Sequence, residues 1–551
     1  MNRVRPDHLS SVDTTPLGAA RNHYREATQA CVVTAGQMQQ IEQRIFEAGM
    51  PVEALMEKVS GQIARWFVAR YKTLWNLAAG PIGILAGPGH NGGDALVVAR
   101  ELYHAGYDIR IYQPFPRCKP LTQQHSRYAK SLNIPFVDSP QDLADCAAIV
   151  DGWFGFGLTR PITGQLATDI GLINQQQTPV FSIDLPSGIH TDTGQVMGAA
   201  LKADYTACLG LWKRAFMQEN ALAYLGDCEL IDFDIPLADV TAVLGEVPAV
   251  QRITRPGAIA HLPLNRSLTA HKYKAGHLLL IAGSRQYAGA ALLTGLGAIA
   301  SGVGMLTLAV PESIRLALLP QLPGALLIGC PETPSGAIAH LPDSLDLEKY
   351  DAIAFGPGLT TAVPSLLQSI FTTGCPLLLD ADGLNLLAKG DPIQQLQSRS
   401  APTVLTPHIG EFKRLFPDIY RQTQDQDPGE SALQAAAASS AIVLLKGPRS
   451  AIAAPCPSAR LWFNPDSTSA LARGGSGDVL TGLIGGLMAA AAAAASPDPT
   501  AITQAVLSAV WWHSQAAIYA SGQRTLLGVD PLHLTQALDP ALQAAISSGV
   551  R

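Results

Sequence analysis

The chain has 551 residues, which is too long for one ordinary hydrophobic core, so two or more domains are expected. A hydrophobic share of 47% and a charged share of 15% exclude a disordered chain, and a net charge of −6 argues against a large nucleic-acid-binding surface. The eight cysteines are scattered without a Cys-x-x-Cys spacing, which excludes paired-cysteine zinc motifs and favours a reducing compartment.

Neither the N-terminus nor any apolar run has a pattern typical of export or membrane insertion. Residues 1–30 lack an apolar stretch, so we expect a flexible tail without a signal peptide. The apolar run Val479–Ala495 is shorter than the roughly 20 residues of a transmembrane helix. It consists mostly of Ala and Gly, which predicts a buried core helix. We therefore expect a cytoplasmic protein that does not bind a membrane.

The first half of the chain alternates between helical and strand patterns. Thr34 is a good N-cap for a helix that ends at Gly49. Apolar runs at 81–87, 108–113, 146–155 and 178–188 each end in a turn, as the strands of parallel βα units do. This alternation predicts a doubly wound α/β domain over residues 31–245.

A passage dotted with Pro and Arg separates this half from a second alternation, and the two domains are expected to meet between 240 and 265. The expected strands of the second half lie at 276–284, 304–311, 351–358, 375–383, 401–408 and 441–448. The second α/β domain is therefore predicted over residues 255–545, and it is also doubly wound.

Each half contains a glycine-rich turn between a strand and a helix, where free backbone N–H groups and the helix dipole favour an anion. In ARGGSGDVLTG, Gly474, Gly475 and Gly477 leave the backbone open, and Asp478 is expected at the first helical position. Because a carboxylate repels phosphate, Asp478 fits a base beside a phosphoryl group better than a phosphate ligand. The simpler alternative is an acidic residue that only begins a helix.

The turn GPGHNGGD in the first half has no Lys and precedes a helix expected to begin near Asp94. Its Asn91 offers an amide oxygen, and two later strand ends offer Asp151, Asp184 and Ser187. Carboxylate, amide and hydroxyl oxygens at neighbouring strand ends suit a small cation, with Asp184 as an acid or base. Alternatively, each Asp only forms a turn.

Other polar residues in the second half allow a functional and a structural interpretation. His408 is either a ligand-binding residue or a loop cap, and Glu411 either joins a magnesium network or begins a helix. Lys446 ends an apolar strand, where a lysine is often only solvated. The turn at 380–383 (DADG) holds two carboxylates but needs no chemistry to explain it.

Taken together, these segments resemble the NAD(P)H-hydrate repair family in its fused form, from about residue 32 to 540. The first half has the epimerase-like motifs VTAGQMQQIEQ, MEKVSG, GPGHNGGDALVVAR, DGWFGFGL and IDLPSGIHTDTG. The second half has the dehydratase-like motifs HKYKAGHLLLIAGS, YAGAALL, FGPGL, DADGLNLLA, TPHIGEF, LLKG and ARGGSGDVLTG. The motif GGSGD alone is shared with the wider ribokinase-like superfamily, so the ordered set carries the resemblance.

In the first half, the resemblance implies a Rossmann-like domain that interconverts the two epimers of hydrated NAD(P)H, NAD(P)HX. Asp184 is then the catalytic residue, and Asn91, Asp151 and Ser187 hold a potassium ion. The residues implied in binding NAD(P)HX are His90, Asn91, Gly92, Gly93, Asp94, Gly155, Phe156, Gly157, Leu158, Thr159, Arg160, Pro161 and Asp184. The family usually has Asn at the place of His90, so this chain departs from the family at that position.

In the second half, the resemblance implies a ribokinase-like domain that dehydrates (6S)-NAD(P)HX with ADP and magnesium, giving AMP and phosphate. Asp478 is then the base that takes the proton of the C6 hydroxyl. Ala290, Gly358, His408 and Asp478 match positions that bind NAD(P)HX. Lys446, Gly447, Pro448, Arg449, Ser450 and Gly477 match positions that bind ADP or AMP.

Two alternatives remain open at this point. The second half can be a vitamin or sugar kinase that leaves the phosphoryl group on its product, and the first half can be a binding or scaffold module without turnover. The retained carboxylate Asp184 and the fusion itself favour repair over both. The expected partners are therefore NADHX, NADPHX and ADP, without nucleic acid or membrane, in a homo-oligomer.

Overall fold

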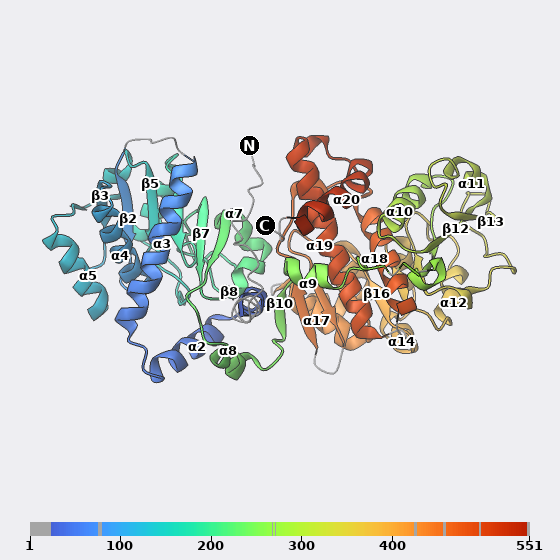
Figure 1. The fold of residues 1–551 in the computed structure, drawn as a ribbon, viewed down its shortest axis with the longest axis horizontal. Helices are drawn as coiled ribbons and strands as arrows, with labels where there is room; N and C mark the ends of the chain where they lie inside the picture. Colours follow the sequence, from blue (N-terminus) through green and yellow to red (C-terminus); the bar gives the residue numbers. More distant parts are fainter. Residues whose placement is uncertain are drawn as a thin grey trace. The chain divides into compact units, whose positions relative to one another are not determined.

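A computed structural model describes residues 24–74, 80–266, 268–269, 271–423, 427–455, 459–494 and 498–547 (Figure 1). The chain divides into two compact units, one formed by Ala27–Val250 and one that contains Gln251–Arg551. Residues 24–30 are helical, so the flexible tail predicted over 1–30 is too long at its C-terminal end. The remainder of that predicted tail, 1–23, lies outside the described residues.

The N-terminal unit alternates strands and helices in the order that the sequence predicts. Its strands are β1 (Val32–Val33), β2 (Ile82–Ala86), β3 (Ile109–Tyr112), β4 (Phe136–Val137), β5 (Ala148–Gly152), β6 (Val180–Ile183), β7 (Tyr205–Leu209), β8 (Trp212–Lys213) and β9 (Asp227–Ile231). Its longer helices are α2 (Ala35–Glu47), α3 (Val52–Leu74), α4 (His90–His104), α5 (Pro120–Ser131), α6 (Gln165–Gln175) and α8 (Leu237–Leu244), and α7 (Leu222–Leu225) is a single turn. Thr34 caps α2 through a capping box with Gln37, as predicted.

The main sheet of this unit has seven parallel strands in the order β4-β3-β2-β5-β6-β7-β9. The chain therefore builds outward from β2 in one direction and then from β5 in the other. In such sheets ligands bind beyond the carboxyl ends of the strands where the direction changes, here β2 and β5. The glycine turn after β2 and Asp151 at the end of β5 both lie at this place.

The C-terminal unit has one sheet of ten strands in the order β10-β19-β18-β17-β16-β15-β14-β11-β12-β13. The strands are β10 (Val250–Arg252), β11 (His277–Ile281), β12 (Met305–Pro311), β13 (Leu326–Cys330), β14 (Ala352–Phe355), β15 (Leu377–Leu379), β16 (Thr403–Leu405), β17 (Ile442–Leu445), β18 (Ala451–Ala454) and β19 (Arg460–Phe463). The strands from β13 to β17 are parallel, whereas β18 pairs antiparallel with β17 and β19. The change of direction lies between β11 and β14. Both units are thus α/β and doubly wound, as predicted.

The helices of this unit are α9 (Arg255–Ala260), α10 (Ala288–Ala300), α11 (Glu312–Leu318), α12 (Ser365–Phe371), α13 (Asp382–Leu387), α14 (Pro392–Gln397), α15 (Ile409–Leu415), α16 (Pro417–Thr423), α17 (Pro428–Ser439), α18 (Ser476–Ala494), α19 (Pro499–Gln523) and α20 (Pro531–Ser547). Within the described ranges, α18 alone is long and apolar enough to cross a membrane by length and composition. Of its most apolar window, 61% is buried inside the unit, which favours the predicted core helix.

Glycines bring the backbones of α10 and α18 into direct contact. A Cβ added at Gly297 of α10 would lie 2.2 Å from the carbonyl oxygen of Val479. A Cβ at Gly482 of α18 would lie 1.9 Å from the carbonyl oxygen of Thr294. Because neither distance admits a carbon atom, these two helices approach each other closely only with glycine at both positions.

Candidate active sites

The second part of the glycine turn after β2, from His90 onward, is already helical. Helix α4 begins at His90, four residues before the predicted start near Asp94, with Gly89 as its N-cap. A Cβ at Gly92 would lie 2.0 Å from the carbonyl oxygen of Gly87, so the glycine allows the helix to begin directly against the end of the strand. The first backbone N–H groups of α4 therefore lie at the edge of the sheet, without intrahelical acceptors.

Asp151 and Ser187, both predicted potassium ligands, contact each other at this edge. The Ser187 hydroxyl donates to Asp151 Oδ1 at 2.6 Å, and the Ser187 N–H donates to Oδ2 at 2.9 Å. The Ser182 hydroxyl and the Trp153 N–H donate to the same carboxylate. Burial raises the pKa of Asp151, and these hydrogen bonds oppose the rise. The side chain is inaccessible to solvent, so it serves first to join the ends of β5 and β6.

Asp184 forms an ion pair with Lys213, a residue that the sequence analysis did not identify. Asp184 Oδ1 lies 2.6 Å from Lys213 Nζ, and Oδ2 accepts a 2.7 Å hydrogen bond from the Phe156 N–H. Lys213 is fully buried and lies on β8. Burial acts to lower the pKa of Lys213, but the charge and hydrogen bond of Asp184, together with the nearby Cys208 and Glu42, outweigh it and the pKa is raised. Asp184 itself has a φ of 67°, a strained conformation for a non-glycine residue.

The first residues of the predicted loop 155–161 lie against Asp184. A Cβ at Gly155 would lie 2.8 Å from Asp184 Oδ2 and 3.1 Å from Asn91 Oδ1, so Gly155 packs directly on both side chains. Asn91 in turn donates to the carbonyl of Ile183 at 3.3 Å. The loop segment 159–161 is exposed. The structure therefore brings Asn91, Gly155, Phe156 and Asp184 together.

Two further carboxyl groups lie in the same electrostatic environment. Burial raises the pKa of Asp94 to about 8, against a hydrogen bond from Ser60 and with support from the charges of Asp184 and Glu42. Burial also raises the pKa of Glu42, to about 7, although Lys213 opposes this rise. Glu42 lies on α2, within the motif VTAGQMQQIEQ, but it was not chosen as a site residue. Its acidic side chain on an amphipathic helix carries no pattern that would have distinguished it.

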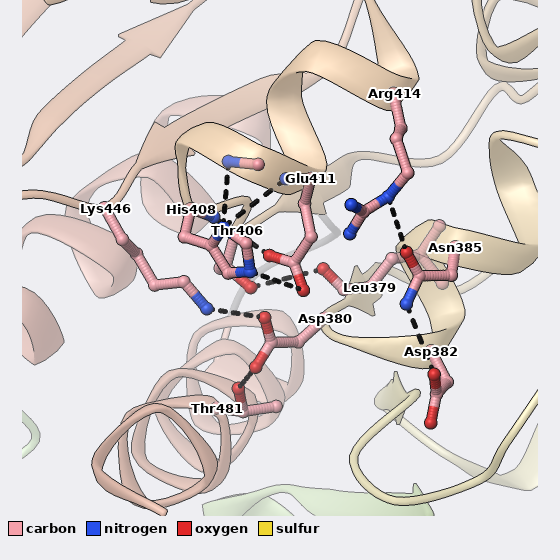
Figure 2. Close-up of polar contacts among 11 residues, drawn as sticks. Leu379, Asp380, Asp382, Asn385, Thr406, His408, Glu411, Arg414, Lys446 and Thr481 are labelled. Atoms are coloured by element: carbon pink, nitrogen blue, oxygen red, sulfur yellow. Dashed lines mark hydrogen bonds and ion pairs between the residues drawn. The ribbon is translucent and has the colours of Figure 1, made fainter. Parts of the chain in front are cut away.

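In the C-terminal unit, a buried carboxylate links three segments (Figure 2). Asp380 follows β15; its Oδ1 lies 2.7 Å from Lys446 Nζ at the end of β17, and its Oδ2 accepts a 2.6 Å hydrogen bond from the Thr481 hydroxyl of α18. Burial acts to raise the pKa of Asp380, but Lys446 and the Thr481 hydroxyl outweigh it and the pKa is lowered. Lys446 is therefore not simply solvated, and the DADG turn is more than a turn.

His408 and Glu411 begin α15 through a capping box (Figure 2). Glu411 Oε2 accepts a 2.9 Å hydrogen bond from the His408 N–H, and His408 Nδ1 accepts a 2.9 Å hydrogen bond from the Gly410 N–H. The backbones of His408 and Lys446 also form a parallel β-bridge beyond the ends of β16 and β17. This geometry supports the structural interpretation of Glu411, while the exposed ring of His408 remains open to a ligand.

Helix α18 begins at Ser476, two residues before the predicted start. Asp478 is therefore the third residue of the helix and not the first. Its side chain is half-buried, and no hydrogen bond or ion pair to it occurs within the described part of the chain. Burial raises its pKa to about 7, with the charge of Asp380 adding to this rise and Lys446 opposing it. A Cβ at Gly477 would lie 3.6 Å from Lys446 Nζ, so the lysine and this turn are neighbours.

The remaining predicted residues gather at the same edge of the sheet. Gly358, with a φ of 67°, would place a Cβ 2.9 Å from the Cβ of Ala290, so these two predicted substrate-binding residues are in contact. The turn after Lys446 is closed by the Ser450 hydroxyl, which donates to the carbonyl of Gly447 at 3.1 Å. Clusters of three or more His, Cys, Asp or Glu side chains able to hold a metal ion are absent from the residues that the structure describes.

Comparison with known proteins covers both units. A family model described as NAD(P)H-hydrate dehydratase matches residues 278–540, and one described as YjeF-related protein N-terminus matches residues 52–215. The bifunctional NAD(P)H-hydrate repair enzyme of Synechocystis sp. is 54% identical over 94% of this chain and 96% of its own. That of Thermosynechococcus vestitus is 48% identical over 95% and 99%. The chain belongs to this family.

A solved structure similar to the C-terminal unit is the ADP/ATP-dependent NAD(P)H-hydrate dehydratase of Bacillus subtilis, co-crystallised with ATP and Mg²⁺. It is 33% identical and covers 53% of this chain and 98% of its own, with a TM-score of 0.44. Within this NAD(P)H-hydrate repair enzyme, Asp184 and Lys213 fall in the YjeF-related match. Asp380, Lys446 and Asp478 fall in the dehydratase match.

Proposed function

We propose that the N-terminal unit interconverts the R and S epimers of NAD(P)HX and that the C-terminal unit dehydrates the S epimer to NAD(P)H with ADP. One observation carries the second assignment. A half-buried carboxylate, Asp478, has no hydrogen-bond or ion-pair partner among the described residues and a pKa of about 7, and it lies at a glycine-rich helix start beside Lys446. Such a group is both able to take a proton near neutral pH and placed where a phosphate would bind.

In the proposed dehydration, ionised Asp478 takes the proton of the C6 hydroxyl while the hydroxyl oxygen attacks the terminal phosphorus of ADP. The bond between that phosphorus and the bridging oxygen breaks, and AMP leaves with the electron pair. The C6–O bond then breaks, so phosphate leaves and the nitrogen lone pair of the ring supplies the electrons. Loss of a C5 proton completes NAD(P)H. A poor leaving group is thus replaced by a good one at the expense of ADP.

The residues proposed to bind ADP or AMP are Lys446 to Ser450 and Gly477, and those proposed for the hydrate are Ala290, Gly358, His408 and Asp478. Magnesium, when bound with the nucleotide, neutralises phosphate charge during transfer. Lys446 supplies only part of that charge, because Asp380 already pairs with it. Gly358, His408 and Lys446 follow β14, β16 and β17, and the contacts of Gly358 with Ala290 and of Gly477 with Lys446 support the assignment.

In the proposed epimerisation, Asp184 faces C6 of the hydrate and assists loss and return of the hydroxyl. Its backbone strain and its contacts with Phe156 and Gly155 support a position inside the binding loop. We propose potassium for this unit. One buried charge, Asp151, with the neutral oxygens of Asn91 and Ser187, fits a monovalent cation better than a divalent one. The cytoplasmic location and the homo-oligomer remain predictions.

One assay tests both assignments. A mixture of both NAD(P)HX epimers is incubated with ADP and Mg²⁺, and recovery of the reduced-nicotinamide absorbance is followed together with release of inorganic phosphate. The intact chain is expected to give full recovery with one phosphate per NAD(P)H. Asp184→Ala is expected to slow conversion once the S epimer is consumed, to the rate of spontaneous epimerisation, and Asp478→Ala to stop it.

Two outcomes contradict the proposal. An unchanged rate with Asp478→Ala shows that Asp478 is not the base. A phosphorylated product that accumulates without release of phosphate identifies the C-terminal unit as a kinase instead.

A further inference from the structure

The backbone around Asp380 is held in one conformation. Ala381, the next residue, has a φ of 49°, which is unfavourable for any residue with a side chain. A Cβ at Gly356 would lie 1.8 Å from the carbonyl oxygen of Asp380, so the end of β14 packs against this turn without room for a methyl group. The carboxylate of Asp380 is therefore presented from a rigid strand end, and strain of this kind is typical of functional sites.

The two carboxylate oxygens of Asp380 have different partners. Oδ1 contacts Lys446 Nζ at 2.7 Å, and Oδ2 accepts the Thr481 hydroxyl at 2.6 Å (Figure 2). Thr481 lies three residues after Asp478 on α18, so one buried carboxylate fixes both the lysine and the helix that carries the proposed base. Asp380 is only 2% exposed, which makes this arrangement costly to disturb.

Several other charged or titratable groups lie on the elements around Asp478. His408 and Glu411 on α15 cap their own helix, and burial raises the pKa of Glu411 although Lys446 opposes the rise. His513 of α19 bonds the Ser476 carbonyl at 3.0 Å through Nε2, and its burial lowers its pKa to about 4. Helix α10 contributes no ionisable side chain. On α20, His533 pairs with Asp530, which immediately precedes the helix. Arg473, in the turn before α18, bonds the Leu527 carbonyl, so among the described groups Lys446 is the cation whose charge lowers the pKa of Asp478.

We propose that Asp380 is a positioning residue for the dehydration, which holds Lys446 at the nucleotide turn and keeps it from pairing with Asp478. This inference rests on the proposed function of the C-terminal unit. With Asp380 charged, Lys446 has a stronger partner than Asp478, and Asp478 remains free to accept a proton. Without that charge, the ammonium group is left beside Gly477, where Asp478 is an available carboxylate.

The expected consequence is a weaker base. Loss of the Asp380 charge removes a group that raises the pKa of Asp478, and closer approach of Lys446 lowers that pKa further. Both effects have the same sign. The pH at which dehydration loses half its activity on the acid side therefore moves below its value in the intact chain, which is expected near 7.

The test is the pH dependence of kcat/KM for dehydration of (6S)-NAD(P)HX by the full chain with Mg²⁺ and saturating ADP. Asp380→Asn is expected to lower kcat/KM by about 10–100-fold at pH 8 and to move the acid-side midpoint to lower pH. Asp380→Glu, which keeps the charge, is expected to restore the midpoint.

Asp382→Asn is the matched control, because Asp382 lies in the same turn but accepts hydrogen bonds from Thr360 and Asn385 and does not contact Lys446. Its midpoint is expected to equal that of the intact chain. A normal midpoint in Asp380→Asn overturns the proposal. If that variant does not fold, Thr481→Val decides, with a smaller shift in the same direction expected and an unchanged midpoint contradictory. An intact chain that yields no NAD(P)H instead refutes the proposed function.

Discussion

The two proposed catalytic carboxylates, Asp184 and Asp478, each lie near a lysine, but only Asp184 pairs with it. Asp184 is 2% exposed and forms its own ion pair with a fully buried lysine, Lys213. Asp478 is half-buried and forms no ion pair within the described ranges, because the lysine beside it, Lys446, pairs with Asp380. The first arrangement holds the side chain in place, whereas the second leaves a group with a pKa of about 7 that can gain and lose a proton near neutral pH. Burial is the main cause of the raised pKa of Asp478, and the two lysines differ in whether they pair with the proposed catalytic carboxylate.

The largest expected effect comes from removing the lysine of the directly paired carboxylate. Lys213→Met leaves the buried Asp184 without a counter-charge, so the free energy of unfolding of the N-terminal unit is expected to fall by about 3–5 kcal/mol. Urea denaturation measures this loss. Combining it with Asp184→Asn is expected to recover most of the stability. Lys58→Met is the control, because Lys58 pairs with Asp234 at the surface and should change stability by less than about 1 kcal/mol.

The second prediction tests whether the position of Asp478 depends on its helix. Gly297→Ala forces α10 and α18 apart, with an expected cost of about 1–3 kcal/mol and a loss of dehydration but not of epimerisation. Gly289→Ala on the same helix is the control, since its Cβ would meet no atom within 4 Å, and it is expected to be neutral or slightly stabilising. Equal dehydration by both variants would contradict the role of the close contact.

The smallest expected effect is a change in the free energy of unfolding that has opposite signs for substitutions at Asp478 and Asp184. A pKa of about 7 in the folded state, above the unfolded value near 3.8, means that Asp478 favours folding at low pH and that this contribution is lost as the pH rises through 7. Asp478→Asn is therefore expected to raise the free energy of unfolding at pH 8 by about 1 kcal/mol, after allowance for solvent screening, and to change it little at pH 4.

Asp184→Asn, by contrast, is expected to destabilise the protein, because it leaves the Lys213 ammonium group buried without its partner. Thermal unfolding of both variants at the two pH values measures the difference. Destabilisation by both substitutions at pH 8 would show that Asp478 is also held by a stabilising partner.

The fold could be predicted from the sequence because strand–turn–helix repeats, glycine turns and the Thr34 cap are local patterns. The residues at the strand ends could be predicted for the same reason. Lys213 and Glu42 could not, because their importance comes from elements that meet only in the folded chain. The helix starts at His90 and Ser476 were placed too late, since glycines that usually mark loops here permit close packing within the first turn. The partnership of Asp380 with Lys446 joins residues 66 positions apart.

The glycine contact between α10 and α18 fixes the start of α18, which carries Asp478, through main-chain atoms. Main-chain atoms of Thr294 and Val479 meet these glycines, so the position of Asp478, the proposed proton acceptor, depends on this contact as well as on the hydrogen bond between Asp380 and Thr481. A larger residue at Gly297 or Gly482 would displace α18 and the proposed base on it. An engineered change of nucleotide or hydrate preference is therefore best sought along the surrounding loops, with this pair of helices left untouched.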